Sequence, residues 1–358
     1  MAQGIHRTLH SPKMSHPLDR LTAVDAATLG TGLPPEHARA AWATAISCAR
    51  TTDTRRSLAG TTPSRVLIVA SANVFTAPIE WAWALSARGV SVVIKSATGL
   101  RAVGEAIALA LPGVEAQSWV GGEVDAEATA MVGAEAVLVF GSTETIESIR
   151  SRARIPVFGF GPRFGVALVD RLDAETATGL AMDHALYDGR GCMSPAGVFV
   201  QEPAELLPLL RALELADAQW PPGEPEASDS IERRTLTMLA TAVGRAHRIR
   251  GWLVVELPAA HFRPRGLPRV VTIHPASDIQ RAIAPWRDEL GTIALTGASE
   301  GDVGDDPALV DRLDLAALPP ARVCAVGEMQ RPPGSRRLHD GLDVLARLWQ
   351  RAVPAPAL

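Results

Sequence analysis

The sequence predicts an α/β protein of two domains, the first built on a parallel, doubly wound sheet. A chain of 358 residues is too long for one simple hydrophobic core, which favours two domains. Between residues 65 and 160, short apolar runs alternate with helical segments, a pattern typical of parallel sheets covered by helices on both faces. The second half alternates differently, so we expect a separate α/β unit there.

The expected elements of the first half follow from apolar runs and helical periodicity. Strands are predicted at "RVLIVA" (65–70), "VSVVIK" (90–95), "AVLVF" (136–140) and "IPVFGF" (155–160). Helices are predicted at 77–89, 101–111 and 143–151, and one more, 34–50, interrupts the polar first 63 residues. Ligands of such sheets bind beyond the carboxyl ends of the strands. The loops 71–76, 96–100 and 141–143 are therefore the candidate binding loops.

The second half contains strand-like runs of less regular spacing and two helical patterns. The expected strands are 165–173, 196–200, 252–257, 269–274 and 292–295, and the expected helices are 229–246 and 340–352. The proline-rich stretch "QWPPGEPEAS" (219–228) predicts a surface loop.

Composition excludes several classes of protein. With 47% hydrophobic and 21% charged residues the chain is globular, and a net charge of −4 gives no reason to expect a nucleic-acid partner. The three cysteines (Cys48, Cys192, Cys324) are far apart, so we expect neither a disulfide framework nor a metal site, and a reducing, cytoplasmic location fits best. No apolar stretch is long enough to span a membrane, and no secretory signal is expected.

Two polar residues end or follow buried strands at the same predicted sheet edge. Asn73, in "VASANVF", could donate a hydrogen bond to a developing oxyanion, or it could be an ordinary turn residue. Lys95, in "IKSAT", must reach an anion or a solvent-filled crevice, because burying an unpaired ammonium is costly. Alternatively, its long side chain could simply extend to bulk solvent from the end of the strand.

A strand–turn–helix at "FGSTETI" (140–146) offers a second kind of site. Gly141, Ser142 and Thr143 would present backbone N–H groups and the positive end of a helix dipole to a phosphate. The same residues could equally form an ordinary helix cap. The GxGxxG fingerprint of dinucleotide sites is absent.

The stretch "YDGRGCMSPAG" (187–197) displays a cysteine in a glycine-rich loop. A core cysteine normally lies within a strand or helix, whereas Cys192 is surrounded by turn-forming residues. The cationic Arg190 and loop N–H groups would favour a reactive thiolate, so Cys192 is the candidate nucleophile. The alternative is a loop cysteine without a chemical role. Cys48, on a predicted helix face, is expected to be a packed residue.

Together these segments resemble the aldehyde dehydrogenase superfamily, and most of all its acyl-CoA reductase branch, typified by the fatty-acid reductase of bacterial bioluminescence. "SANVF" resembles P-W-N-F-P, "VVIKSAT" resembles V-V-x-K-P-A-E, "FGSTETI" resembles F-T-G-S-T-x-x-G, and "GRGCMSP" resembles G-Q-x-C-x-A-P. "FGPRFGVALV" (160–169) and "GEMQRPPGSRRLHDG" (327–341) point to the narrower branch. The resemblance covers roughly residues 60–345, and the order of four motifs is more specific than any one of them.

The resemblance implies an aldehyde-dehydrogenase-like fold with a nicotinamide-cofactor-binding domain at 64–164 and a catalytic cysteine domain at 165–340. Residues 1–63 would be a helical extension, and 341–358 a terminal helix and tail. Cys192 would form an acyl-enzyme whose oxyanion is held by Asn73 and the Cys192 backbone N–H. Lys95 would contact the cofactor ribose, and Gly141, Ser142 and Thr143 its pyrophosphate.

Departures from the superfamily pattern sharpen the expectation. Residues 157–163 lack the glutamate that activates water in hydrolytic members, so an acyl-cysteine would survive to be reduced. The motif glutamine is Arg190. Thr98 replaces the glutamate that follows the cofactor lysine, and Arg101 comes soon after, which suits a 2′-phosphate and hence NADPH over NADH.

The resemblance therefore implies an NADPH-dependent reductase of acyl thioesters, with CoA or a carrier-protein thiol as leaving group. A homo-oligomer, and a complex with an acyl-supplying enzyme, are the expected assemblies. A cysteine-dependent acyltransferase without redox chemistry and a non-catalytic scaffold remain alternatives. The His339–Asp340 pair could donate a proton, or Asp340 could be a helix N-cap beside a surface histidine.

Overall fold

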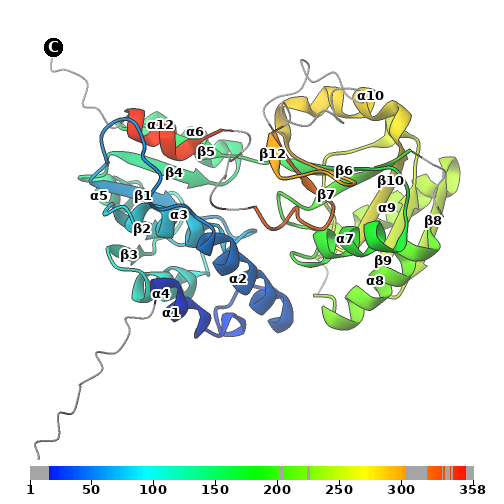
Figure 1. Ribbon diagram of the computed structural model, residues 1–358, viewed down its shortest axis with the longest axis horizontal. Coiled ribbons are helices and arrows are strands. Elements are labelled where there is room, and N and C mark those ends of the chain that lie inside the picture. The colour runs from blue at the N-terminus through cyan, green and yellow to red at the C-terminus, as the bar shows by residue number, and fades with distance from the viewer. Residues whose placement is uncertain are drawn as a thin grey trace, which may run out of the picture.

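The computed structural model describes residues 16–201, 205–223, 226–302, 321–332, 334, 339 and 342–351, and these form two α/β units side by side (Figure 1). Their boundary falls between strands β5 (Val157–Phe160) and β6 (Phe164–Val169), which belong to different sheets. The predicted fold class is thus confirmed.

Among the described residues, the first sheet has five parallel strands in the order β3-β2-β1-β4-β5. Its strands are β1 (Arg65–Val69), β2 (Ser91–Lys95), β3 (Val114–Gln117), β4 (Ala136–Phe140) and β5. The chain runs outward from β1 to β3 and then returns to β4 on the other side of β1. The carboxyl ends of β1 and β4 therefore flank the switch point of the sheet, where α/β sheets bind ligands.

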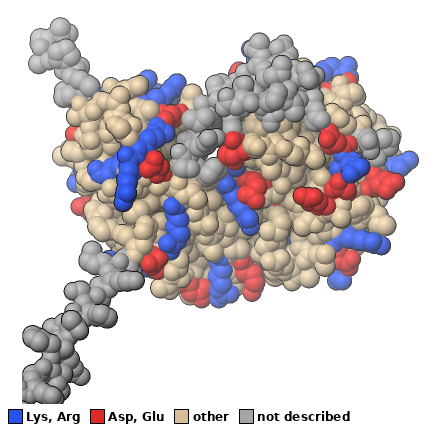
Figure 2. All heavy atoms as spheres, viewed as in Figure 1, with Lys and Arg blue, Asp and Glu red and all other residues tan. Residues whose placement is uncertain are grey.

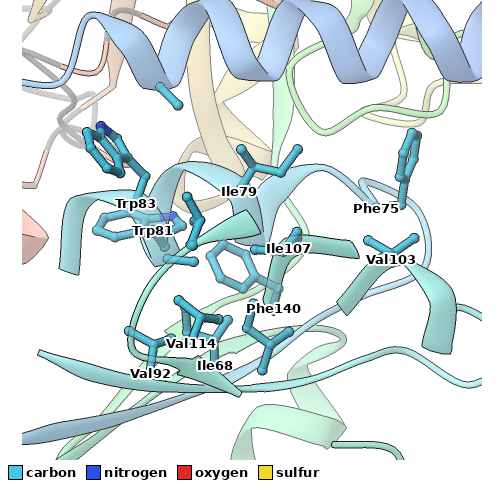
Figure 3. Packing of buried hydrophobic residues seen from close by; sticks show 14 of the residues in the cluster. Ile68, Phe75, Ile79, Trp81, Trp83, Val92, Val103, Ile107, Val114 and Phe140 are labelled. Atoms are coloured by element: carbon cyan, nitrogen blue, oxygen red, sulfur yellow. The ribbon is translucent and has the colours of Figure 1, made fainter. Parts of the chain in front are cut away.

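Apolar strand faces pack against helices on both sides of this sheet. The helices are α1 (Pro17–Thr22), α2 (Pro35–Arg50), α3 (Ala77–Ser86), α4 (Arg101–Ala110), α5 (Val124–Met131), α6 (Thr143–Arg152) and the last helix, α12 (Val344–Arg351). Figure 3 shows one face, where Ile68 and Val92 of the strands meet Ile79 and Trp81 of α3 and Ile107 of α4. Alternate strand residues such as Leu67 and Val93 fill the opposite face.

The second sheet is mixed, with the strand order β12-β13-β11-β6-β7-β10-β9-β8 among the described residues. Beyond β6 its strands are β7 (Pro195–Val200), β8 (Arg245–Ile249), β9 (Trp252–Glu256), β10 (Val270–Pro275), β11 (Leu290–Leu295), β12 (Gly301–Asp302) and β13 (Arg322–Ala325). Its helices are α7 (Ala174–Ala185), α8 (Leu207–Gln219), α9 (Ala227–Val243) and α10 (Ile279–Ile283). The edge strands β8 and β12 are antiparallel to their neighbours.

The surface carries charged side chains of both signs. On the face shown in Figure 2, acidic and basic side chains are interspersed over both units. No helix in the described ranges is both long enough and apolar enough to cross a bilayer.

Two buried histidines should make the second unit sensitive to acid. Burial lowers the pKa of His184 and of His274 to about 4, below the ordinary value of about 6.5. The native state therefore favours the neutral rings, so stability is retained above pH 6.5 and lost as the pH falls towards 4. We expect each ring to cost roughly 2 kcal/mol of unfolding free energy at pH 5.

Urea unfolding at pH 7 and pH 5 checks this expectation. The stability lost between these pH values should be smaller in His274→Asn than in the native protein. Equal losses in the two proteins would contradict it.

Candidate active site

A cavity of about 450 Å³ lies where the two units meet, and loops from both sheets line it. From the first unit come the segments that follow β1 and β4, the two strands at the switch point. From the second come the loop between α7 and β7 and residues 264–266. Of the three loops predicted to bind ligands, 71–76 and 141–143 contribute residues to the lining of the cavity, whereas 96–100 does not.

Asn73 and Cys192 both line this cavity. Asn73 lies in the turn between β1 and α3, with an exposed side chain, and Gly141 and Ser142 join it from the end of β4. Cys192 lies in the turn just before β7 and is half-buried. The structure thus brings together four of the residues singled out from sequence, which are separated by up to 119 positions in the chain.

A buried hydrogen bond ties the cysteine loop to the first unit. The Tyr187 hydroxyl lies 2.7 Å from Thr76 Oγ1, at the start of α3. Burial raises the pKa of this phenol, so the tyrosine stays protonated at neutral pH. The contact joins the loop that carries Cys192 to the start of α3 across the boundary of the two units.

Glycine lets a second loop pack against the cysteine loop. Gly189 has φ of +75°, and a Cβ there would meet Leu267 O at 2.7 Å. A Cβ at Gly266 would meet Gly189 O at 2.2 Å. The glycine-rich composition that stood out in the sequence therefore serves backbone packing next to the thiol.

The structure argues against activation of the Cys192 thiol by the positive charge of Arg190. The Arg190 guanidinium pairs with Glu226 and with Asp229, each at 2.8 Å. Its charge is compensated by these two carboxylates, so it does not act on Cys192 as an isolated cation. Arg190 instead anchors the cysteine loop to the start of α9.

A buried polar network supports the cysteine turn from behind. Gln330 Nε2 donates to Ser194 Oγ (2.9 Å) and to Asp183 O (3.0 Å). The Asp183 carboxylate accepts the backbone N–H groups of Gly327 and Met329 at 2.7 and 3.0 Å. Burial raises the pKa of Asp183 to about 7 despite these bonds. Sequence patterns did not predict this network, although Gln330 lies in the stretch "GEMQRPPGSRRLHDG" that resembles the acyl-CoA reductase branch.

Two further residues line the cavity: Glu80, which was not predicted as a site residue, and His339, whose role the sequence left undecided. Glu80, on α3, is buried and lines the cavity, although residues 157–163 themselves contain no carboxylate. His339 also lines it, with its ring 4.2 Å from that of Phe160. The alternative of an N-cap at Asp340 lies outside the described residues, and the last helix begins only at Val344, capped by Asp343.

The remaining cysteines differ in their surroundings. Cys48 is buried on α2, as expected, but it also lines the cavity. Cys324 is fully buried in β13, and burial raises its pKa to about 12. No disulfide links these three cysteines, all of which lie in the described part of the chain.

The other proposed cofactor residues lie at the same sheet edge but outside the cavity. Lys95 ends β2, is buried, and lies 5.8 Å from the centre of the Trp119 ring. Burial lowers its pKa, and nearby Glu127 opposes this. Thr98 is exposed in the following turn, and Arg101 pairs with Glu105 at 2.6 Å. Thr98 and Arg101 are thus accessible at this edge, whereas Lys95 is largely covered.

The turn after β4 forms a helix N-terminus that suits a phosphate, but the Glu144 carboxylate already lies there. Thr143 begins the ten-residue helix α6, and Ser142 Oγ caps it by accepting the Thr145 N–H. The Glu144 carboxylate accepts hydrogen bonds from the Ser142 hydroxyl and from its own backbone N–H, which lowers its pKa. A bound phosphate would have to displace this exposed carboxylate from the helix N-terminus.

This architecture, with a cysteine loop of one α/β unit facing the switch point of another, is that of an aldehyde-dehydrogenase-like protein. Aldehyde dehydrogenase 21 from Physcomitrella patens, solved with its reaction product succinate, superposes with a TM-score of 0.58 at 14% identity, covering 91% of this chain and 80% of that one. An NAD-dependent benzaldehyde dehydrogenase from Corynebacterium glutamicum gives 0.54 at 14% identity, covering 83% and 80%. Identities this low establish the fold alone.

The sequence comparison identifies the family within this fold. The model of the acyl-CoA reductase (LuxC) family matches residues 114–351, well over half of the chain. The protein belongs to this family. A curated relative, the long-chain acyl-protein thioester reductase of Aliivibrio fischeri, is 29% identical over 162 residues, which are 42% of this chain and 33% of the relative. The match thus spans about a third of that relative's length.

Proposed function

We propose that the protein reduces an acyl thioester to an aldehyde with NADPH, through an acyl-enzyme on Cys192. One observation carries the proposal: a cysteine turn of one unit and an asparagine turn of the other line the same cavity. Membership of the acyl-CoA reductase family supports the same chemistry. Residues 64–164 would bind the cofactor, and 165–340 would carry the nucleophile.

The chain's own residues would act in the first half-reaction. The Cys192 sulfur attacks the thioester carbonyl, and the bond from that carbon to the departing sulfur breaks after a tetrahedral intermediate. The Asn73 amide and the Cys192 backbone N–H donate to the oxyanion of this intermediate. The proton of the Cys192 thiol would end on the departing CoA or carrier-protein thiol, and His339, which lines the same cavity, would pass it on.

The second half-reaction requires a hydride donor at the same carbon. Lys95, Gly141, Ser142 and Thr143 would hold the reduced nicotinamide cofactor, which would supply the hydride for the acyl carbon. Asn73 would again hold the oxygen, and collapse of the hemithioacetal would return the thiolate of Cys192 and release the aldehyde.

Asn73→Ala should lower kcat by roughly 10²- to 10³-fold, the usual cost of removing one oxyanion donor. Asn73 is exposed in a turn, so the fold should tolerate the change. Stopped-flow measurement of thiol release, which follows acylation alone, checks the effect. An unchanged acylation rate would show that Asn73 is an ordinary turn residue and does not stabilise the oxyanion.

NADPH should bind more tightly than NADH, by about 10- to 150-fold, because Arg101 can donate to a 2′-phosphate. Its present partner Glu105 is an exposed i,i+4 contact worth only about 0.3–0.5 kcal/mol, so the guanidinium can exchange it at little cost. Dissociation constants of both cofactors for the native protein and Arg101→Ala test this. Arg150→Ala, which breaks a similar exposed pair on α6, is the matched control.

A screen of NADPH oxidation and aldehyde release with acyl-CoAs of increasing length tests the proposal as a whole. Thioester cleavage without NADPH consumption would favour an acyltransferase, and absence of both would favour a scaffold. We also propose that the protein is cytoplasmic and forms a homo-oligomer. The family resemblance further implies that it associates with an enzyme that supplies the acyl group.

A further inference from the structure

A second cavity, of about 440 Å³, lies beside the cysteine loop and is rich in arginine. The charged side chains that line it are those of Asp188, Asp229, Arg233, Arg234, Arg248 and Arg269. Four arginines against two aspartates leave an excess of positive charge. This cavity has no role in the chemistry described above.

Both aspartates of the lining are already neutralised. The buried Asp188 pairs with Arg269 Nε at 2.5 Å, and Asp229 pairs with Arg190 at 2.8 Å. Arg269 also pairs with Asp217 and lies over the Trp252 ring. These ion pairs are structural, because they fix the cysteine loop to β10 and to α9.

The other three arginines make no ion pair with any carboxylate among the residues that the structure describes. Arg233 donates to three backbone carbonyls, those of Pro268 (2.7 Å), Arg269 (3.2 Å) and Gly251 (2.8 Å), which hold its guanidinium in place. Arg248 donates only to Thr237 Oγ1, at 3.1 Å. Burial lowers the pKa of Arg233, and repulsion from Arg248 and Arg269 lowers it further, while Asp188 and Asp229 partly oppose this. The Arg233 guanidinium is thus held in place by the backbone, and Arg234 and Arg248 add exposed positive charge beside it.

Secondary structure directs these groups to one place. Asp229, Ser230, Arg233 and Arg234 recur on one face of α9 at helical spacing, and all four line the cavity. Arg248 reaches the cavity from the edge strand β8. Arginine guanidinium groups converging in a hollow are the usual means by which proteins bind phosphate groups.

The cavity is also close to the nucleophile. Asp188 lines the second cavity, while Gly189 and Cys192 line the first. Four residues of chain span at most about 14 Å, so the Cα atoms of Asp188 and Cys192 lie within that distance. The long, linear pantetheine arm that joins a thioester to its phosphate covers a distance of this order.

We propose that the second cavity binds the phosphate of the thiol carrier, so that Arg233, Arg234 and Arg248 hold the phosphorylated end of a CoA or phosphopantetheine thioester while its acyl carbon lies at Cys192. This assignment rests on the proposed function. It names a binding site for the part of the substrate that does not react.

The test compares acyl-CoA, acyl-4′-phosphopantetheine and acyl-pantetheine of one chain length as substrates. Arg234→Ala/Arg248→Ala should raise KM for acyl-CoA at least about tenfold with kcat unchanged, because the lost contact is made equally before and in the transition state. KM for acyl-pantetheine, which has no phosphate, should not change. Arg211→Ala/Arg245→Ala removes the same charge from exposed positions outside the cavity and is the control.

The three substrates also distinguish the source of the phosphate. A raised KM for both phosphorylated thioesters supports the 4′-phosphate shared by CoA and carrier proteins, and a raised KM for acyl-CoA alone supports the nucleotide phosphates of CoA. Equal effects on all three substrates, no effect, or an effect confined to the KM of NADPH would overturn the assignment.

Direct binding separates this proposal from the proposed function. Calorimetry with CoA and with pantetheine should show weaker CoA binding in Arg234→Ala/Arg248→Ala than in the control variant, whether or not the protein reduces anything. If the native protein binds CoA through these arginines but forms no aldehyde, the phosphate-binding site would stand and the proposed reductase function would be wrong.

Discussion

Cys192→Ala should abolish the acyl-enzyme and lower the reductase rate by roughly 10⁴-fold or more, as removal of a catalytic nucleophile does. The expected result follows from the position of Cys192, half-buried in a turn that lines the cavity opposite Asn73. Cofactor binding should be nearly unchanged, because the proposed cofactor residues belong to the other unit. Intact-protein mass spectrometry after incubation with an acyl-CoA, without reductant, measures the adduct.

Cys324→Ala is the matched control, because this thiol is fully buried in β13 and does not line the cavity. Its variant should still form the adduct. Cys48 is a weaker control than the sequence suggested, since it lines the same cavity as Cys192. An adduct that persists in Cys192→Ala would refute the nucleophile assignment, and its absence in Cys48→Ala would move the assignment to α2.

Aldehyde should exceed free acid by at least about 100-fold when an acyl-CoA and NADPH are supplied together. A positioned general base usually contributes 10²- to 10⁴-fold to such a hydrolysis, and residues 157–163 provide no carboxylate for this role. Quantifying both products by gas chromatography from one reaction gives the ratio.

The structure identifies which carboxylate would be responsible if acid dominated. Glu80 lines the cavity, whereas Glu328 is exposed and Asp188 is held by Arg269. If the free-acid product disappeared in Glu80→Gln, Glu80 on α3 would be the base that replaces the missing glutamate. The expectation of slow hydrolysis, which rests on the lack of a carboxylate in residues 157–163, would then be wrong. Glu105→Gln, an exposed position on α4, serves as the control.

The sequence predicted the first sheet well because its strands are short, apolar and buried on both faces. The predicted run 136–140 coincides with β4, and those at 65–70 and 90–95 differ from β1 and β2 by one residue. The second unit was predicted less completely: α7, α8, α10, β8, β12 and β13 were missed, as were α1, β3 and α5 in the first. In β8, "RAHRI" has no apolar alternation, and it is a strand only because it pairs with the buried β9 at an edge.

For the candidate site, the sequence by itself determined the types of residue that could do chemistry and the strand ends that display them. Parallel strands place Asn73, Lys95 and Ser142 at one edge wherever the strands lie in the sheet. Only the tertiary structure decided which of them meet Cys192. The order β3-β2-β1-β4-β5 puts the ends of β1 and β4 together and places Lys95 one strand further out. Local patterns do not encode strand order or the partner of a side chain, because contacts between distant segments fix both. For the same reason only the folded chain shows Arg190 neutralised by α9, Glu80 in the cavity, and three arginines gathered beside the cysteine loop.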